Sequence, residues 1–265
     1  MSFDRIVKKN MYKYMPTSIC CSSTLNKIDL LKCIFEDNTL RFTSPLYFND
    51  PFEFRFPIKN LNPSSSENLN ELINLLNATF SLHNNALDNV LQDVGVLCLS
   101  SKFDDLKMWG HYADNHKGIV LEFDNKHDFF YKSTDDINLL HELKKLNYSK
   151  ERVTFETENE YFNTIENENG LIYLTKNKEW EHEQEYRMTI KFDESNNSNK
   201  YNVKFPTEII KSVYIGVNAS EKDIQYIIDL KKQDKWNHLQ IYRFTIGSNE
   251  YKLVPLKAVS RNITK

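Results

Sequence analysis

The chain has 265 residues, 40% of them hydrophobic, with 34 Lys and Arg against 37 Asp and Glu and a formal net charge of -3. This composition suits a globular protein with a sizeable core, and it provides no global basic field that would draw the chain to nucleic acid. No stretch approaches the roughly 20 apolar residues of a membrane span, and the first residues lack a signal-peptide pattern, so we expect a cytoplasmic protein without a membrane partner.

The hydrophobic spacing predicts short strands interleaved with helices along the whole chain. In chain order, strands are predicted over residues 12–14, 38–43, 94–99, 119–123, 180–192, 211–217 and 239–246, and helices over residues 24–35, 106–113, 137–146 and 220–230. The polar segment at 62–66 leads into a helical insertion at about 61–93. This order predicts a single α+β domain over residues 1–265, in which a mixed, mostly antiparallel sheet forms the core and helices are inserted between strands.

The cysteines and histidines give no metal-binding pattern. The chain has four Cys and seven His, and Cys20 and Cys21 are simply adjacent. His111 and His116 lie five residues apart, which is a poor match to the four-residue spacing that lets two imidazoles of one helix share a zinc ion. The chain also lacks a glycine-rich phosphate loop. We therefore predict a protein without a metal site.

Two clusters in the first fifth of the chain carry more polar groups than packing requires. Strand alternation places Tyr12 and Tyr14 on one face and Lys13 on the other. Lys13 is then either a solvated residue of an edge strand or a ligand contact. Asn49 and Asp50 precede a proline, where their side chains can close an Asx turn or form part of a polar site.

A third cluster lies in the helix predicted around residue 109. Trp109, Tyr112 and Ala113 share one helical face, which favours a core position for the tryptophan, whereas His111 lies off that face and could reach a ligand. Gly110 inside this helix costs up to about 1 kcal/mol relative to alanine, which suggests close approach by another group.

The fourth cluster is the stretch 180–192, which is predicted to be a strand. Alternation places Glu183, Glu185 and Arg187 on one face, opposite an apolar row that begins at Tyr186. Charges gathered in this way form either a solvated sheet face or the wall of a polar cleft.

Three motifs in this order resemble a bacterial family, the domain of unknown function numbered 2971. The motifs are the segments 42–53 and 108–118, followed by Lys176, Trp180, Glu183, Glu185 and Arg187. The resemblance extends from about Tyr12 to Gly216. It implies no activity, because the family is defined by sequence.

The chain is also similar, more distantly, to the ADP-ribosyltransferase superfamily, including its DNA-modifying toxin branch. The similarity lies in the order of an aromatic first strand, a helix, a strand and loop, a tyrosine-bearing helix and a late strand with Glu-x-Glu. It implies an ADP-ribosyltransferase-like fold and NAD as substrate, with Glu185 as the catalytic glutamate and Glu183 as the residue that orients the acceptor. The expected cofactor contacts are Tyr12, Lys13, Tyr14, Asn49, Asp50, Trp109, His111, Tyr112 and Arg187.

The functional prediction is therefore an enzyme that uses NAD to modify a nucleic acid or a protein, as a bacterial toxin or anti-phage defence effector with a neutralising or defence-system partner. The first strand departs from the superfamily pattern because it has no His or Arg. Arg187 could hold Glu185 ionised or bind the pyrophosphate itself. Two alternatives stay open, namely a non-catalytic module of the same fold that binds a nucleotide, nucleic acid or protein, and an NAD or nucleotide glycohydrolase.

Overall fold

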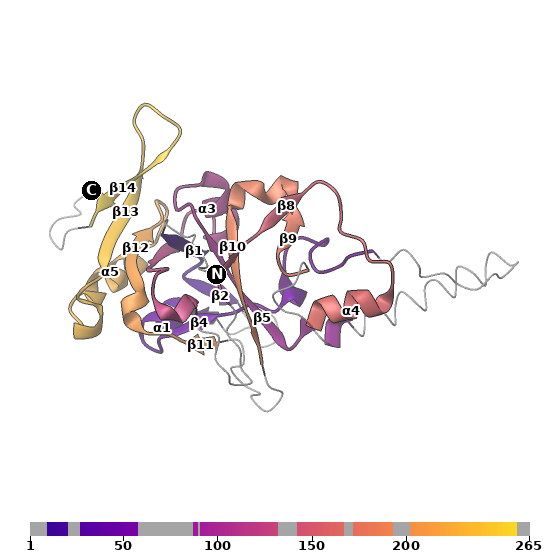
Figure 1. Ribbon diagram of the computed structural model, residues 1–265. Helices are drawn as coiled ribbons and strands as arrows, with labels where there is room; N and C mark the ends of the chain where they lie inside the picture. Colours follow the sequence, from indigo (N-terminus) through magenta and orange to yellow (C-terminus); the bar gives the residue numbers. More distant parts are fainter. Residues whose placement is uncertain are drawn as a thin grey trace, which may run out of the picture.

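The computed structural model describes residues 10–20, 27–57, 87–89, 91–131, 142–166, 172–192 and 202–258. An eight-stranded sheet runs through it in the order β14-β13-β12-β6-β1-β5-β10-β7 (Figure 1). Its strands are β1 (Met11–Met15), β5 (Val94–Ser100), β6 (Ile119–Phe123), β7 (Lys144–Lys145), β10 (Glu185–Lys191), β12 (Ile210–Ile215), β13 (Gln240–Ile246) and β14 (Leu253–Lys257). Neighbouring strands are antiparallel except for the parallel pair β12 and β13, which confirms a mixed α+β fold.

The remaining elements are short. The helices are α1 (Leu30–Phe35), α3 (Leu106–Tyr112), α4 (Glu158–Glu166) and α5 (Glu221–Leu230), and the 3-10 helices are η1 (Pro45–Tyr47), η2 (Asp128–Phe130), η3 (Lys178–Glu183), η4 (Thr207–Ile209) and η5 (Asp234–Trp236). Three two-stranded pairs join β2 (Ser18–Cys20) to β3 (Lys27–Asp29), β4 (Thr39–Arg41) to β11 (Asn202–Lys204), and β8 (Asn147–Ser149) to β9 (Thr175–Asn177). None of the helices within the described ranges has the length and apolar character needed to span a bilayer.

Helix capping explains where the helices begin. The Asp105 carboxylate accepts hydrogen bonds from two backbone amides in the first turn of α3, and the Ser220 hydroxyl accepts one from the Asp223 amide at the start of α5. The helix predicted over 24–35 begins only at Leu30, because Asp29 caps α1 and residues 27–29 pair with β2. That prediction was therefore too long at its N-terminal end.

Three other predicted helices or strands differ from the structure or fall outside the described residues. The helix predicted over 137–146 does not extend to its end, because β7 occupies 144–145 and pairs with β10. The strand predicted as the last one, β13, is followed by β14. The helical insertion predicted at about 61–93 falls largely outside the described residues.

Two apolar layers hold the sheet. On one side a large core cluster includes Met188 and Ile190 of β10 together with Ile224 and Ile227 of α5. A smaller cluster joins α3 to β1 and contains Trp109 packed against the ring of Tyr14. The alternation predicted for β1 agrees with this arrangement, since both of its tyrosines contact the smaller cluster and Lys13 does not.

Two glycines allow a left-handed turn to pack against the sheet. Residues 114–116, which follow α3, all have positive φ, with values of 46°, 52° and 67°. A Cβ atom at Gly216 would lie 2.1 Å from the carbonyl oxygen of His116, and one at Gly118 would lie 2.2 Å from that of Met15. These backbone contacts leave no space for a side chain. At Gly110, by contrast, a Cβ would meet no atom of the described residues within 4 Å outside its own helix, so no protein group there makes the close approach that was predicted.

We expect Gly118→Ala to lower the free energy of unfolding by about 1–3 kcal/mol or more, because the added methyl group would overlap backbone atoms that cannot rotate away. Gly110→Ala is the matched control, and it should leave stability unchanged or raise it by about 0.4–1 kcal/mol. Urea unfolding of the two variants checks this. Equal stability of both variants would contradict the packing described for the turn.

Candidate functional site

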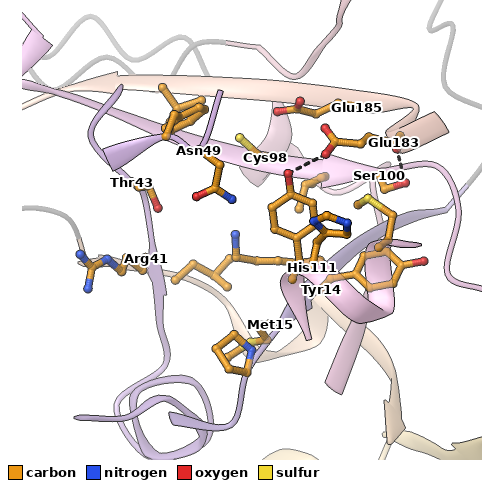
Figure 2. Close-up of a pocket in the computed structure, with 18 of the residues that line it drawn as sticks. Tyr14, Met15, Arg41, Thr43, Asn49, Cys98, Ser100, His111, Glu183 and Glu185 are labelled. Atoms are coloured by element: carbon orange, nitrogen blue, oxygen red, sulfur yellow. Dashed lines mark hydrogen bonds between the residues drawn. The ribbon is translucent and has the colours of Figure 1, made fainter. Parts of the chain in front are cut away.

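A cavity of about 810 Å³ lies beside β1, β5 and β10 (Figure 2). Its volume is in the range of about 300–1,000 Å³ that is typical of small-molecule sites. It brings together most of the residues that the sequence singled out, which are Tyr12, Lys13, Tyr14, Asn49, Asp50, His111, Tyr112, Glu183 and Glu185. These side chains come from both halves of the chain, so the fold gathers them into one place.

Trp109 does not line this cavity. Its side chain is fully buried, packs edge-on against Tyr14 and Phe244, and donates a hydrogen bond from Nε1 to the Phe103 carbonyl at 2.8 Å. The structure places it in the core, as its helical face favoured, and so corrects its listing among the cofactor contacts. It therefore supports the wall of the cavity from behind.

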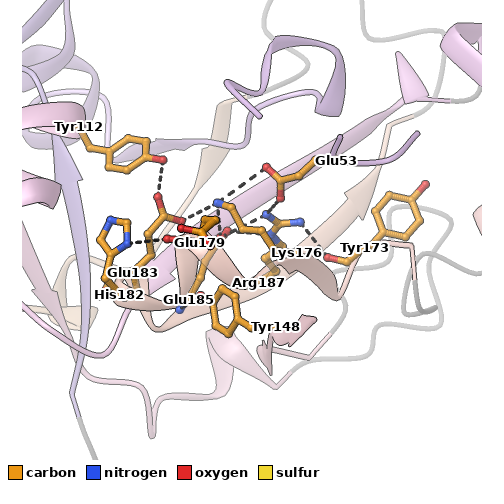
Figure 3. A network of polar contacts seen from close by, with 11 residues as sticks. Glu53, Tyr112, Tyr148, Tyr173, Lys176, Glu179, His182, Glu183, Glu185 and Arg187 are labelled. Atoms are coloured by element: carbon orange, nitrogen blue, oxygen red, sulfur yellow. Dashed lines mark hydrogen bonds and ion pairs between the residues drawn. The ribbon is translucent and has the colours of Figure 1, made fainter. Parts of the chain in front are cut away.

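Arg187 also lies outside the cavity, at the centre of a buried charged network (Figure 3). Its Nε donates to Glu185 Oε1 at 2.7 Å, and its Nη2 donates to Glu185 Oε2 at 3.2 Å. Nη2 also pairs with Glu53, and Nη1 donates to the Tyr173 carbonyl at 3.0 Å. The guanidinium lies over the rings of Phe48 and Phe54 as well. Every direction around it is occupied by protein.

Lys176 is the second cation of the network. Its ammonium donates to Glu183 Oε2 at 2.5 Å and to Glu185 Oε2 at 3.1 Å, and lies 3.8 Å from Glu53 Oε2. The hydroxyl of Tyr112 donates to the other oxygen of Glu183 at 2.6 Å. Three buried carboxylates thus share two buried cations, which leaves an excess of one negative charge when all five groups are ionised.

Glu183 reaches this network by a route that strand alternation does not describe. It ends the 3-10 helix η3, and Gln184 then adopts a left-handed conformation with φ 45° and ψ 52° before β10 begins at Glu185. The predicted strand over 180–192 therefore starts about five residues too early. Glu185 and Arg187 do share one face of β10, and the turn at Gln184 brings Glu183 beside them.

The environment shifts the pKa values of Glu185 and Glu53 in opposite directions. Burial by itself raises the pKa of Glu185, but the charges of Arg187 and Lys176 outweigh it and lower the pKa to about 2. The pKa of Glu53 is raised, because burial there outweighs the same two cations. Glu185 is therefore ionised throughout the physiological range.

Two further cations line the cavity without such partners. The side chains of Lys13 and Arg41 make no hydrogen bond or ion pair in the described part of the chain, and burial lowers the pKa of Lys13. Figure 2 shows Arg41 on the opposite side of the cavity from Glu183 and Glu185. The cavity thus has an acidic wall whose charges are paired and cationic groups whose charges are available to a ligand.

Asp50 and Asn49 lie at another edge of the cavity. Asp50 Oδ1 accepts a hydrogen bond from the Phe52 amide at 2.9 Å, which is the Asx turn that the sequence left open, and Asp50 is buried. Asn49 is exposed, and Figure 2 shows its side chain within the group of residues that lines the cavity.

Sequence patterns assign no specific role to several residues that contribute to the site. Glu53 and Lys176 occur in the motifs, but local sequence patterns cannot predict that Glu53 pairs with Arg187, which lies 134 positions later in the chain. Arg41 and Cys98 were treated as ordinary strand residues, yet both line the cavity. Burial raises the pKa of the Cys98 thiol, so it stays protonated. Within the described residues, no group of three or more His, Cys, Asp or Glu is placed to hold a metal ion.

Residues 108–188 match the family model described as "Protein of unknown function (DUF2971)". The match supports the resemblance to the DUF2971 family over this segment. The segment contains most of α3, including Tyr112, and the network residues Lys176, Glu183, Glu185 and Arg187, whereas Lys13 and Glu53 come from outside it. The chain matches no curated protein and no solved structure. The confirmed part of the family resemblance is thus the DUF2971 segment, and the similarity to ADP-ribosyltransferases stays a prediction.

We expect Arg187→Met to lower the free energy of unfolding by about 3–5 kcal/mol, because it leaves three buried carboxylates with Lys176 as their only buried cation. Glu185→Gln should cost less, since two carboxylates then face two cations. Urea unfolding of both variants at neutral pH measures the difference. A larger loss for Glu185→Gln than for Arg187→Met would show that charge balance does not control the network.

Proposed function

We propose that the protein is an ADP-ribosyltransferase-like enzyme that binds NAD in the cavity and transfers ADP-ribose to a macromolecular target. One observation carries the proposal: an ionised, buried carboxylate, Glu185, forms part of the wall of a cavity that is also lined by Lys13 and Arg41, whose side chains have no ion pair within the described residues. A ligand that suits this cavity has an anionic part and a centre that becomes positive during reaction. NAD has both.

The acidic wall suits cleavage of the bond between nicotinamide and ribose. When this bond breaks, nicotinamide leaves as a neutral molecule with the bonding electron pair, and the ribose becomes positively charged. No proton donor is needed, because the leaving group is already cationic in NAD. A fixed carboxylate in a water-poor site stabilises the developing charge better than solvent does, and the low pKa of Glu185 keeps it in the required form.

The cationic groups suit the pyrophosphate. Lys13 on β1 and Arg41 on β4 line the cavity and have no protein partner in the described residues. Arg187 is a poor candidate for this role, since it is fully buried and its nitrogens are already engaged. Its role in the proposal is to hold Glu185 ionised and in place.

The aromatic groups suit the nicotinamide ring. Tyr112 lines the cavity, and the hydrogen bond from its hydroxyl to Glu183 fixes the orientation of the ring. Trp180 lies nearby, where the Lys176 ammonium is 5.0 Å from its ring centroid. Rings held in this way can stack on a planar ligand and exclude water from the reacting bond.

The resemblance to the toxin branch favours a role as a bacterial toxin or anti-phage defence effector. The acceptor in this proposal is a nucleic acid or a protein, and Glu183, next to Glu185, is the residue placed to orient it. A protein of this kind would require a neutralising or defence-system partner in its own cell.

Glu185→Gln should reduce the rate of NAD cleavage by about 10²–10³-fold, because it removes the charge that stabilises the ribosyl cation while keeping the side-chain shape. The assay incubates the purified protein with adenylate-labelled NAD and cell lysate, and follows nicotinamide release and transfer of label. The matched control is Glu181→Gln, a change at an exposed glutamate of the adjacent η3.

The same assay separates the proposal from its alternatives. Transfer of label to a macromolecule supports it. Nicotinamide release without transfer identifies a glycohydrolase, and binding of NAD without either product identifies a binding module. Loss of activity in Glu181→Gln equal to that in Glu185→Gln would contradict the assignment of Glu185.

Lys13→Gln should raise KM for NAD by about tenfold or more and change kcat less, because it removes one charge-assisted contact to the pyrophosphate in both ground and transition states. Lys117→Gln, a change at an exposed lysine outside the cavity, is the control. An unchanged KM in Lys13→Gln would remove Lys13 from the phosphate site.

A further inference from the structure

We infer that the side-chain amine of Lys13 captures a small aldehyde or ketone that carries an anionic group, by forming an imine inside the cavity. The anionic group of this ligand pairs with Arg41. Capture of this kind goes beyond the proposed function. It does not depend on NAD, because it uses the uncharged amine of Lys13 rather than the ammonium that would bind pyrophosphate.

Lys13 lies on the apolar face of a central strand. β1 lies between β6 and β5 in the eight-stranded sheet. Alternation places the Lys13 side chain on the same face as those of Met11 and Met15, which belong to the large core cluster. Leu121, which is opposite Lys13 in the register of β1 and β6, belongs to the same cluster. An ammonium group is poorly hydrated in such a layer, so its charged form is disfavoured there.

The amine of Lys13 is accessible from the cavity. The side chain is half-buried and lines the cavity together with Leu99 and Met15. Across the described ranges, no other side chain or backbone group forms a hydrogen bond or ion pair with it. The Nζ atom is also not one of the fully buried atoms that lack a partner in this part of the chain. It is therefore in contact with space that a ligand can occupy.

The surroundings favour the uncharged form of this amine. Burial lowers the pKa of Lys13, and the nearby charge of Arg41 lowers it further. Cys98 and Glu185 would both raise it if both were ionised, but burial keeps the Cys98 thiol protonated. Only an uncharged amine is a nucleophile, and a lysine desolvated by apolar neighbours is the type of residue that forms imines with carbonyl compounds.

Imine formation needs no other reactant. The amine nitrogen attacks the carbonyl carbon, and the carbonyl oxygen leaves as water with the two hydrogens of the free amine. A carbon–nitrogen double bond thereby replaces the carbon–oxygen double bond, and nothing is oxidised or reduced. The captured compound stays bound to Lys13 until water reverses the step.

Arg41 sets the class of ligand. It lines the cavity, and its charge is close enough to act on Lys13. Figure 2 shows it, with Met15, on the side of the cavity away from Glu183 and Glu185, whose charges would repel an anion. A guanidinium binds carboxylate and phosphate groups through the same paired hydrogen bonds. The ligand therefore combines a carbonyl group with a carboxylate or a phosphate, and a cavity of about 810 Å³ accommodates an aromatic compound of this kind.

The test traps the imine in the full chain by reduction with cyanoborohydride and locates it by mass spectrometry of peptides. Three aldehydes are compared at neutral pH, namely para-carboxybenzaldehyde, para-formylphenyl phosphate and the neutral para-formylbenzamide, which resembles the carboxylate in shape. Saturable labelling of Lys13 is expected, and it should be about tenfold or more faster with an anionic aldehyde than with the amide. The faster of the two anionic aldehydes identifies the anionic group.

Three results of this experiment would overturn the inference. They are the absence of label on Lys13, equal labelling of Lys13 by the neutral amide, and labelling of exposed lysines such as Lys117 at the same rate as Lys13. NAD takes no part in the reaction, so these results leave the proposed function unaffected.

Two variants assign the contacts. Arg41→Gln should slow the labelling of Lys13 by the anionic aldehydes about tenfold and affect the amide much less, whereas Arg152→Gln, at an exposed arginine outside the cavity, should behave as the unchanged chain does. Equal slowing in both variants would remove Arg41 from the site. Lys13→Met should leave the free energy of unfolding unchanged or raise it, since methionine suits the apolar face. A large loss of stability would show that Lys13 has a structural role and would contradict a free amine.

Discussion

The pairing of Arg187 with Glu185 and Glu53 is the interaction on which the rest of the site depends. It joins the middle of β10 to a loop more than a hundred residues earlier in the chain, and Lys176 extends it to Glu183 and so to Tyr112. Taking these charges out of water is costly unless every group finds a partner. Because the network meets that requirement with side chains from four separate segments, it fixes their relative positions and thereby the shape of the cavity wall.

The two kinds of charge around the cavity have different functions. The carboxylates are held by lysine and arginine, so their orientation is set before any ligand arrives, which is the condition for electrostatic stabilisation of a developing cation. Lys13 and Arg41 are held by no such partners within the described residues, so their charges are available for binding an anionic ligand. This division between paired acids and available cations is the physical basis for proposing a pyrophosphate-containing substrate.

The DUF2971 segment accounts for only part of this arrangement. It supplies the tyrosine-bearing helix, Lys176 and the acidic end of β10. Lys13, Arg41 and Glu53 come from the N-terminal quarter of the chain. The cavity therefore requires residues from before the matched segment as well as from inside it.

The sequence alone determined the α+β class, most strands of the eight-stranded sheet, the helices α3 and α5, and the shared face of Glu185 and Arg187, because these depend on local periodicity and capping. Most of the site residues that it singled out line the cavity, since polar groups beside aromatic ones in short motifs stand out from core patterns. Only the tertiary structure decided that Arg187 is an internal counter-ion, that Trp109 is core and that Arg41 faces the cavity. Those outcomes depend on partners far away in the chain, and on the left-handed turn at Gln184, for which no local periodicity exists.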